Sequence, residues 1–404
     1  MSSRERRERL QLKALGMEHL SQYNELLRYV FQVTNRDLQN SGYEEGEFAR
    51  AHRPILEKAD VIGWFNGDKL VSQLSIYPNQ VNIHGRIVPM GGLTGVGTYP
   101  EYANLRLMTD LIKVGLEHMR DKGQIISYLC PYSVPFYRKK GWEILSERVT
   151  FRVKDSQLPE IVDIPGFVER LPALHPDVIA TYDRFARKNH GAMLRRDIQW
   201  EEYWRWENED ERTAAVYYEG RHKPTGYMLY WIEKDIFHVK EMVYLTQEAR
   251  LGLWNFITAH YSMINRVEGR IYKNAPLAYL LEDSQIIETI EPYSMARIVD
   301  VAAFLRQYPF ARAGRPFHFV VIDPLADWNR GVFGLTWDGK TPEVTREPVG
   351  KSAALSIRTL TAMLMGFRRP SFFHEIQQLE VDTRTLALLE DIIPESQPYF
   401  SDYF

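Results

Sequence analysis

The feature that most constrains the fold is a segment of residues 91–143 in which the hydrophobic period changes twice. A glycine-rich apolar run ends at Thr98, and apolar residues at helical spacing then predict a helix from near Asn104 to Gly123. A short apolar strand, Ile125–Leu129, follows. Because the helix joins the two strands as a crossover, the sequence predicts that the strands lie parallel.

This strand–turn–helix–strand unit favours one kind of ligand. The unpaired N–H groups at the start of the helix, together with the helix dipole, suit phosphate oxygens. Two parallel strands that diverge leave room for an extended chain such as the pantetheine arm of an acyl-CoA. The unit therefore predicts an acyl-CoA site in the N-terminal part of the chain.

The length of 404 residues predicts two or three domains. The order of strands and helices predicts a mixed α/β fold of the α+β class with three, residues 1–155, 156–288 and 289–404. In the first domain we expect a strand at 10–15, a helix at 17–33, and strands at 59–65, 70–77 and 88–98. A similar order of helices and strands recurs between residues 178 and 272, which indicates a weak internal duplication. In the third domain we expect strands at 295–300, 317–323 and 331–337 and helices at 357–367 and 383–392.

Composition limits the class of protein. The net charge is only −3, so neither a nucleic acid nor a membrane is an expected partner. No apolar run approaches the roughly 18 residues of a membrane span. A single cysteine, Cys130, excludes an internal disulfide, which favours a cytoplasmic protein with Cys130 as an inert packing residue. Residues 4–9 alternate in charge and predict a frayed, solvated start of the chain.

The stretch from Val96 to Met108, followed by PFYRKKGWE at residues 135–143, resembles motifs A and B of the Gcn5-related N-acetyltransferases (GNAT). More narrowly, the whole chain is similar to the Eis (enhanced intracellular survival) family of aminoglycoside acetyltransferases, with MARIVD at 295–300 and DPLADWN at 323–329 as family-like segments. The resemblance implies an acetyltransferase domain, a second acetyltransferase-like domain and a C-terminal sterol-carrier-like domain. It also implies a homo-oligomer, by analogy a hexamer.

The resemblance assigns expected roles to individual residues. The backbone of Val96, Gly97 and Thr98 would align the thioester and pantetheine of acetyl-CoA. Tyr137 would protonate the departing thiolate, and the α-carboxylate of Phe404 would accept a proton. The other expected cofactor contacts are the pyrophosphate loop and first helical turn, Asn104, Leu105, Arg106, Leu107, Met108 and Thr109, and a second patch, Tyr132 and Ser133.

The pyrophosphate loop departs from the family pattern Arg/Gln-x-x-Gly-x-Gly/Ala, because positions 103–108 read Ala-Asn-Leu-Arg-Leu-Met. Ala103 lacks a phosphate-pairing side chain, and Arg106 stands where a glycine would let the backbone approach phosphate. Losing one charge-assisted hydrogen bond costs about 1.5–3 kcal/mol, a roughly 10- to 150-fold loss of affinity. Arg106 can instead make a bidentate phosphate contact of its own.

These residues suit acyl transfer from a thioester to an amine. A strand N–H can stabilise the oxyanion, and a tyrosine hydroxyl with a pKa near 10 can share a proton with a thiolate whose pKa is near 8.5. Without the resemblance, Tyr137 would be read as a packing residue and Phe404 as a frayed end. The acidic residues Glu390, Asp391, Glu395 and Asp402 would suit a polycationic acceptor, although solvated surface charge explains them more simply.

The leading hypothesis is an acetyl-CoA-dependent N-acetyltransferase acting on a primary amine of a cationic small molecule. By resemblance the acceptor is an aminoglycoside or a similar amine, and a peptide lysine or a polyamine stays open. Two alternatives also stay open: a domain that binds acyl-CoA without turnover, motivated by Ala103 and Arg106, and a lipid carrier with an apolar cavity in the C-terminal domain. The eleven histidines show no metal-ligand spacing, so no metal is expected.

Overall fold

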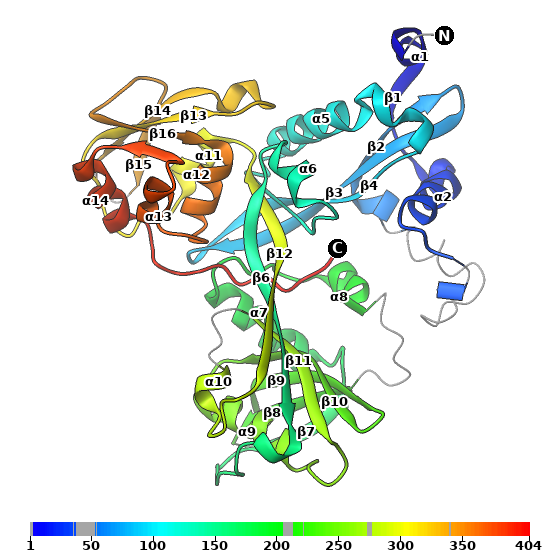
Figure 1. Cartoon of the computed structure of the whole chain (residues 1–404), viewed down its shortest axis with the longest axis vertical. Coiled ribbons are helices and arrows are strands. Elements are labelled where there is room, and N and C mark those ends of the chain that lie inside the picture. The colour runs from blue at the N-terminus through cyan, green and yellow to red at the C-terminus, as the bar shows by residue number, and fades with distance from the viewer. Residues whose placement is uncertain are drawn as a thin grey trace.

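The structure is a computed structural model that describes residues 3–34, 36–37, 53, 55–204, 213–220, 222–272, 277–338 and 341–404. It has three lobes: in Figure 1 the first and third lobes lie at the top and the central lobe lies below them. The fold is mixed α/β, with two lobes that share one sheet and a third lobe with a sheet of its own, as the sequence predicts.

A single twelve-stranded sheet runs through the first and central lobes. Only two neighbouring pairs in it are parallel, β4 with β5 and β10 with β11. The strands, in their order across the sheet, are β1 (Leu10–Ala14), β2 (Asp60–Asn66), β3 (Lys69–Ile83), β4 (Arg86–Thr98), β5 (Ile126–Leu129), β12 (Ile287–Ile298), β6 (Glu143–Lys154), β11 (Arg266–Tyr272), β10 (Ile236–Tyr244), β9 (Lys223–Glu233), β8 (Thr213–Glu219) and β7 (Phe167–Pro172).

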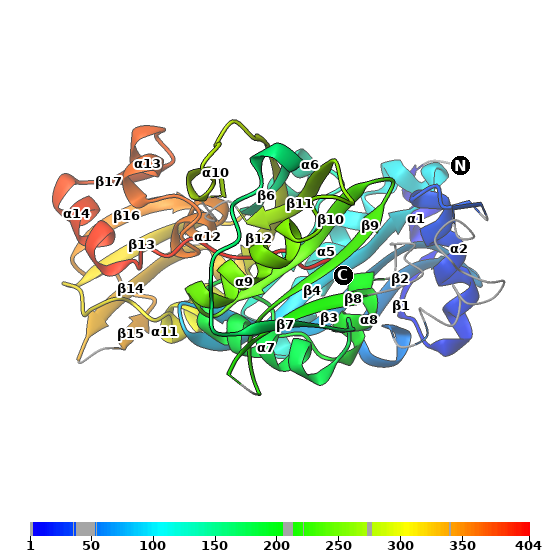
Figure 2. The same cartoon turned by 90° about the horizontal axis from the view of Figure 1, so that it is seen from below.

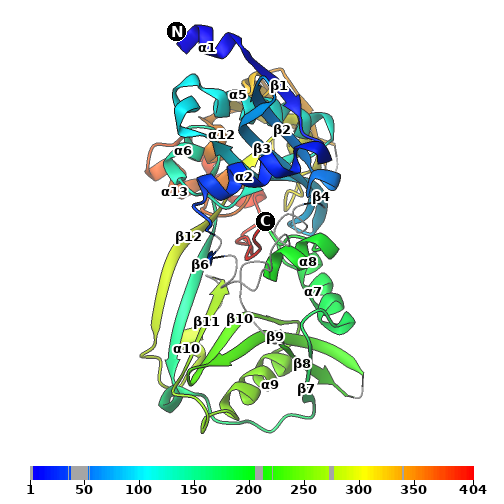
Figure 3. The ribbon, with the colours of Figure 1, turned by 90° about the vertical axis from the view of Figure 1, so that its right-hand side faces the viewer.

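Two long strands, β6 and β12, join the lobes. They pair antiparallel and run side by side from the first lobe to the central lobe (Figures 1 and 3). The strand β6 is absent from the sequence prediction, although Val149, Phe151 and Val153 alternate with more exposed residues and are buried in the structure. The expected domain limit at residues 288 and 289 falls inside β12, and the bounds of the three domains remain a prediction.

The helix expected from near Asn104 begins later. A 3₁₀ helix, η2 (Pro100–Leu105), comes first, and α5 (Leu107–Asp121) begins after it. The break lies at Arg106, whose φ of +60° is left-handed and cannot continue a right-handed helix. Leu111, Ile112, Leu116 and Met119 of α5 are buried against side chains of β3 and β4, as the helical spacing predicts.

The start of the chain is not frayed. Residues Ser3–Glu8 form α1, and Arg6 donates to the carbonyl of Glu101 at 2.8 Å. Arg7 donates to the carbonyl of Leu105 at 3.2 Å and forms an ion pair with Asp110. The alternating charges therefore anchor α1 on the loop that precedes α5, which a sequence reading of solvated charge misses.

The remaining helices cover the faces of the sheets. None of the helices in the described part of the chain has the length and apolar character that a membrane span requires. In the first two lobes they are η1 (Met17–His19), α2 (Leu20–Val30), α6 (Val134–Arg138), η3 (Asp155–Gln157), α7 (Pro176–Lys188), α8 (Asp197–Trp204), α9 (Gln247–Thr258) and α10 (Leu277–Leu280).

The third lobe is a five-stranded sheet with its own helices, and Figure 2 shows it at the opposite end of the molecule from α1 and α2. The strand order is β15 (Pro342–Thr345), β14 (Gly331–Trp337), β13 (Phe317–Ile322), β16 (Lys351–Ser356) and β17 (Leu379–Val381). The helices are α11 (Val301–Gln307), η4 (Asp327–Asn329), α12 (Ile357–Leu364), α13 (Pro370–Glu375) and α14 (Thr383–Ile392).

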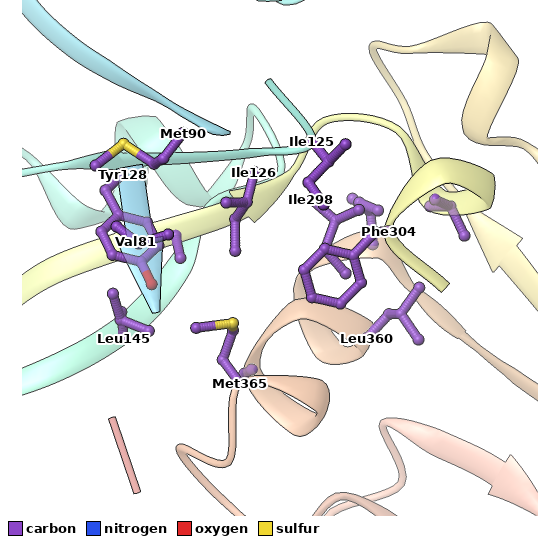
Figure 4. Close-up of a cluster of buried hydrophobic side chains, with 14 of the residues drawn as sticks. Val81, Met90, Ile125, Ile126, Tyr128, Leu145, Ile298, Phe304, Leu360 and Met365 are labelled. Atoms are coloured by element: carbon purple, nitrogen blue, oxygen red, sulfur yellow. The ribbon is translucent and has the colours of Figure 1, made fainter. Parts of the chain in front are cut away.

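One hydrophobic core connects the first and third lobes. Figure 4 shows Met90 and Tyr128 of the first lobe in the same cluster as Phe304 and Leu360 of the third. Phe317, Phe319, Phe333 and Leu355, on the five-stranded sheet, are at most 3% exposed and belong to that cluster. The two lobes therefore pack as one body, and the apolar face on which a lipid cavity would depend is filled by packed side chains.

Candidate active site

The two parallel strands β4 and β5 diverge, as predicted. They pair only between Met90–Gly92 and Ile126–Tyr128, whereas β4 continues to Thr98. Beyond this pairing, β4 contains a bulge on the side of β3. Thr94 pairs with Ser75 and Gly97 pairs with Gln73, so two residues of β4 lie opposite one residue of β3. The opening between the strands therefore begins directly after Gly92.

Glycine is required within this bulge. Gly95 has a φ of +59°, and a Cβ atom there would lie 2.8 Å from both the Ser75 hydroxyl oxygen and the Tyr23 hydroxyl oxygen. A bulge of this kind interrupts the ladder and re-aims the backbone of one strand. The glycine-rich run GGLTGVGT is the sequence signal of this geometry, although Gly95 is not among the residues predicted to form the site.

The predicted thioester-aligning residues lie at the end of β4. Ser72 donates to the Gly97 carbonyl at 3.2 Å, and its hydroxyl lies 2.7 Å from the Thr98 hydroxyl. These bonds attach one edge of β4 to β3, so the other edge of Val96, Gly97 and Thr98 borders the opening. The arrangement fits a ligand that uses backbone groups, and the contacts themselves remain a prediction.

The predicted pyrophosphate loop divides into buried and exposed residues. Leu105 and Leu107 are 4% and 1% exposed and pack into the core, so only their backbones are available to a ligand. Asn104 and Arg106 are exposed. The side chain of Arg106 therefore stands free at the start of α5, where N–H groups of the first turn have no partner within the helix.

A further cation lies at this helix start. Lys140, in the loop after α6, donates to the Thr109 hydroxyl at 2.6 Å. Burial, together with the charges of Arg106 and Lys139, lowers the pKa of Lys140 against the opposing effect of Asp110. Arg106 and Lys140 thus place positive charge at a helix start where Ala103 supplies none, and Lys140 is not among the residues predicted to bind the cofactor.

Tyr137 is held in a mostly apolar pocket. It lies in α6, which begins at Ser133, whose hydroxyl accepts from the Phe136 N–H at 3.4 Å. The Tyr137 ring is 7% exposed and meets the Trp142 ring edge-on at 6.2 Å. Burial raises the pKa of Tyr137 to about 12. In the part of the chain that the structure describes, its hydroxyl has no hydrogen-bond partner.

The two predicted residues of the second cofactor patch differ in environment. Tyr132 is 90% exposed and lies outside the core. Ser133 is committed to capping α6 through its hydroxyl. Neither residue is brought against the opening between β4 and β5 by a contact with its strands, so their role as cofactor contacts stays a prediction.

The C-terminal end lies beside β4. Thr94 donates its hydroxyl to a main-chain oxygen of Phe404 at 2.9 Å. The Phe404 ring is 6% exposed, lies 6.1 Å from the Tyr77 ring, and occupies space that a Cβ atom at Gly92 would invade at 2.8 Å. Figures 1 and 3 show this segment leaving the third lobe and ending between the first lobe and α8. Phe404 therefore lies against β4, and its role in the reaction stays a prediction.

Cys130 connects Tyr137 with the C-terminal segment. Its thiol lies 3.8 Å from the Asp402 carbonyl oxygen, to which Tyr293 also donates at 2.9 Å. Burial and the nearby Asp402 raise the pKa of the Cys130 thiol to about 12, and Cys130 in turn contributes to the raised pKa of Tyr137. The thiol of Cys130 therefore packs against the C-terminal segment at Asp402.

A buried ion pair between β12 and the third lobe holds the loop that follows Tyr137. Arg297 donates to Asp323 at 2.6 Å, and both side chains are fully buried. Arg297 also donates to the Lys140 carbonyl, and a Cβ atom at Gly141 would overlap its guanidinium. The MARIVD and DPLADWN segments therefore meet through this ion pair, a link that the sequence alone did not predict.

The acidic residues near the C-terminus are mostly paired. Glu390 pairs with Arg369 at 2.7 Å, and Asp391 pairs with Arg312. Asp402 is buried against Arg195. Three of the four acidic side chains considered for a cationic acceptor are therefore engaged within the molecule.

Comparison with known proteins matches this architecture. Two family models described as acetyltransferase (GNAT) domains match residues 11–145 and 191–298, and a sterol carrier protein domain matches residues 301–401. An uncharacterized N-acetyltransferase of Streptomyces avermitilis is 25% identical over 330 residues, 76% of this chain and 79% of that protein.

Solved structures share the whole fold. A protein of unknown function from Enterococcus faecalis, described as a probable N-acyltransferase, has a TM-score of 0.88 and 25% identity, with 98% of this chain and 100% of that chain covered. Eis1 from Mycobacterium abscessus has a TM-score of 0.82 and 17% identity over 98% of this chain and 100% of its own, a likeness of fold. The chain therefore belongs to the GNAT acetyltransferases, acetyl-CoA-dependent enzymes, and has the Eis-like arrangement of two such domains and a sterol carrier protein domain.

Proposed function

We propose that the enzyme transfers the acetyl group of acetyl-CoA to a primary amine of a small molecule in the opening between β4 and β5. Tyr137 is the general acid and the α-carboxylate of Phe404 is the proton acceptor. The observation that carries the proposal is the hydrogen bond from Thr94 to the main-chain oxygen of Phe404, because it fixes the end of the chain beside the strand that would align the thioester.

In the proposed reaction the amine nitrogen attacks the thioester carbonyl carbon, and a C–N bond forms as the C–S bond breaks. A backbone N–H at the end of β4 stabilises the oxyanion. The leaving thiolate takes the phenolic proton of Tyr137, and the Phe404 carboxylate takes the proton of the new ammonium group. Solvent restores both groups after the products leave.

The raised pKa of Tyr137 suits this role. At about 12, the hydroxyl stays protonated at neutral pH, which is the state that an acid requires. Burial raises the pKa of a thiol as it raises that of a phenol, so a thiolate released beside Tyr137 is a stronger base than in water and accepts the phenolic proton more readily.

The charges at the start of α5 support acetyl-CoA binding despite the altered loop. Arg106 and Lys140 stand at the N-terminus of this helix, where phosphate oxygens also meet free N–H groups. They would replace the side chain that Ala103 lacks. Binding without turnover remains the competing function, and a measured rate decides between the two.

The acceptor class is tested with a panel of amines. The resemblance predicts a cationic, aminoglycoside-like acceptor, so the panel contains aminoglycosides, polyamines, lysine peptides and neutral amines. We expect release of free thiol from acetyl-CoA above background with at least one class. Acetyl-CoA binding by calorimetry, with no thiol release from any class, would contradict the proposed function and favour a binding module.

Assembly and location complete the proposal. A homo-oligomer, a hexamer by analogy, is expected in the cytoplasm. Light scattering of the purified chain measures its mass in solution, and a monomer would contradict the expected assembly.

The proton acceptor makes a direct prediction. One glycine added after Phe404 moves the carboxylate by a residue, about 3.5 Å along the chain. We expect kcat to fall roughly 100-fold, since displacements of about an ångström already have effects of this size. The same glycine added at the N-terminus is the control. Normal turnover by the C-terminally extended enzyme would exclude Phe404 as the acceptor.

A further inference from the structure

The central lobe repeats the diverging strands of the first lobe. The parallel strands β10 and β11 pair only from Ile236 to Val239 and from Arg266 to Gly269, and β10 then bulges at Lys240. The helix α9 follows β10, as α5 follows β4. The second half of the duplication therefore has the backbone of an acyl-CoA site.

The helix start in the central lobe does not suit phosphate. Thr246 caps α9 by accepting from the Ala249 N–H at 3.2 Å. Glu248 lies in the first turn and accepts from the Tyr217 hydroxyl at 2.6 Å, and a hydrogen bond from Thr246 lowers the pKa of Glu219. Two carboxylates thus occupy the end of the helix dipole that Arg106 and Lys140 leave to an anion in the first lobe.

The opening between β10 and β11 is instead turned toward the C-terminal segment. A pocket at this position is lined by residues of β10 and β11, by Tyr293 of β12, and by Tyr399, Phe400 and Ser401 of the C-terminal segment. The residues directly before Asp402 therefore form one wall of the second opening.

A buried three-residue ion cluster fixes the segment there. Arg195 donates to both carboxylate oxygens of Glu241, at 3.0 and 2.6 Å, and to Asp402 at 2.5 Å. The three side chains are at most 3% exposed. The guanidinium also lies 3.8 Å from the centre of the Tyr182 ring, and the Tyr182 hydroxyl donates to Asp402 at 3.0 Å. The bidentate bond to Glu241 fixes the plane of the guanidinium, and the remaining Nε–H then fixes the position of the Asp402 carboxylate.

Fixing Asp402 fixes the proposed proton acceptor. Phe404 follows two residues later, and two residues span at most about 7 Å. The Asp402 carbonyl also accepts from the Tyr293 hydroxyl, at 2.9 Å. Phe404 is therefore held from two sides, through Asp402 by Arg195 and directly by the hydrogen bond from Thr94.

We infer that Arg195, held by Glu241, is a positioning residue of the reaction: the central lobe has given up an acyl-CoA site of its own and uses that opening to hold the C-terminal carboxylate in the first lobe. The inference rests on the function proposed above. Arg195 does not touch substrate and acts through Asp402.

The test combines kinetics with a readout that needs no acetyl transfer. Arg195→Met removes the anchor, and Asp402→Asn is the milder variant because it keeps a hydrogen-bonding side chain of the same shape. Arg195→Lys keeps the charge but not the fork. The control is Arg184→Met in α7, whose side chain bonds to the Thr181 hydroxyl at 3.2 Å and to the Pro224 carbonyl within the central lobe.

We expect kcat to fall roughly 100-fold in Arg195→Met. We expect kcat to fall about 10-fold in Asp402→Asn, because this variant displaces the Phe404 carboxylate less than Arg195→Met does. The KM for acetyl-CoA should change less than about threefold, because Arg106, Lys140 and the start of α5 are unchanged in these variants. Arg195→Lys should recover part of the rate. Mass spectrometry during carboxypeptidase digestion should show Phe404 released at least about tenfold faster from Arg195→Met and Asp402→Asn than from the parent or Arg184→Met.

The two readouts separate this inference from the proposed function. Unchanged protection of Phe404 in both variants overturns the anchor, and faster release with an unchanged kcat overturns its role in positioning. Absence of acetyl transfer by the parent enzyme, with Phe404 protected and then released in the variants, overturns the proposed function and with it positioning, while the anchor itself is confirmed.

Discussion

Arg106 breaks the pattern of the pyrophosphate loop but keeps the backbone conformation that a glycine would adopt there. Its φ of +60° and ψ of 16° are left-handed, directly before the first turn of α5. A non-glycine residue in this region costs roughly 1–2 kcal/mol. The chain tolerates this strain where a guanidinium is placed beside the free N–H groups of a helix, which indicates that the side chain is retained for binding.

Arg106→Gly should therefore change stability and binding in opposite directions. Relief of the left-handed strain should raise the free energy of unfolding by about 1 kcal/mol. Loss of the guanidinium should weaken acetyl-CoA binding roughly 10- to 150-fold. Urea unfolding measures the free energy of unfolding, and calorimetry measures the affinity for acetyl-CoA. The control is Lys113→Met in α5, because a glycine at position 113 would lie inside the helix and destabilise it. Tighter acetyl-CoA binding in Arg106→Gly would show that the arginine obstructs the phosphates.

Tyr137→Phe should affect the chemical step alone. The hydroxyl has no hydrogen-bond partner in the described residues, so its removal should leave the melting temperature nearly unchanged. General acid catalysis contributes typically 10²- to 10⁴-fold, so kcat should fall within that range while the Kd for acetyl-CoA stays constant. Single-turnover kinetics with the best amine of the panel measure the step. A rise in KM with kcat unchanged would contradict the assignment of Tyr137 as the acid.

At the scale of elements, the loop after α6 depends on a strand of the large sheet and a loop of the third lobe. Arg297 of β12 bonds to the Lys140 carbonyl on one side and to Asp323 on the other. Asp323 also accepts from the N–H groups of Leu325 and Ala326, at 2.9 and 3.1 Å. This carboxylate therefore orders its own loop and neutralises a buried guanidinium at the same time.

Asp323→Ala should be strongly destabilising because it leaves Arg297 buried and unpaired. Removing one partner of a buried pair costs about 3–5 kcal/mol. The control is Asp327→Ala in the same loop, because Asp327 and Arg330 form an exposed ion pair at 3.0 Å. Exposed pairs are worth about 0–1 kcal/mol. Urea unfolding compares the variants, and equal losses in the two would show that the buried pair is not what connects the lobes.

The elements that the sequence predicts are those whose information is local. The parallel arrangement of β4 and β5 follows from the helical spacing between them, and it is correct. The position of β12 between β5 and β6 depends on contacts between residues far apart in the sequence, such as Ile287 with Arg152 and Ile298 with Ile126, and no local pattern predicts it.

The candidate site divides in the same way. Val96–Thr98, Tyr137 and Phe404 were predicted because a family motif marks them, and the structure places Phe404 beside β4. Lys140 and Arg195 were not predicted, because each matters through a partner distant in sequence, Thr109 and Asp402 respectively. Charge patterning suggested a solvated start and an acidic tail, but long-range ion pairs hold both.

At the scale of the whole molecule, the three lobes meet at a pair of stacked histidines. His84, from the β3–β4 turn, lies 3.6 Å from His190, which precedes α8. The His84 N–H donates to His190 Nδ1 at 3.0 Å, so His190 Nε2 carries the proton that reaches the Met365 carbonyl at 2.8 Å. His84 Nε2 lies 3.1 Å from the carbonyl of Leu364, the last residue of α12, which Met365 follows directly. Two neutral imidazoles therefore join the first, central and third lobes.

Acid should separate these lobes before it affects their individual cores. Burial lowers the pKa of His84 to about 4 and that of His190 to about 3, with Arg369 and the neighbouring imidazole adding to the effect. In the unfolded chain both groups titrate near 6.5, so the unfolded state binds more protons below that pH. The stabilising contribution is thus complete above pH 6.5 and decreases as the pH falls toward the two folded values. Between pH 7 and 5 the loss of stability is about 2 kcal/mol for each histidine.

Urea unfolding at pH 7 and at pH 5 measures this loss. In the double variant His84→Gln, His190→Gln the difference in the free energy of unfolding between the two pH values should shrink by about 4 kcal/mol. The same pH dependence in the variant and the parent would place the acid sensitivity in other groups.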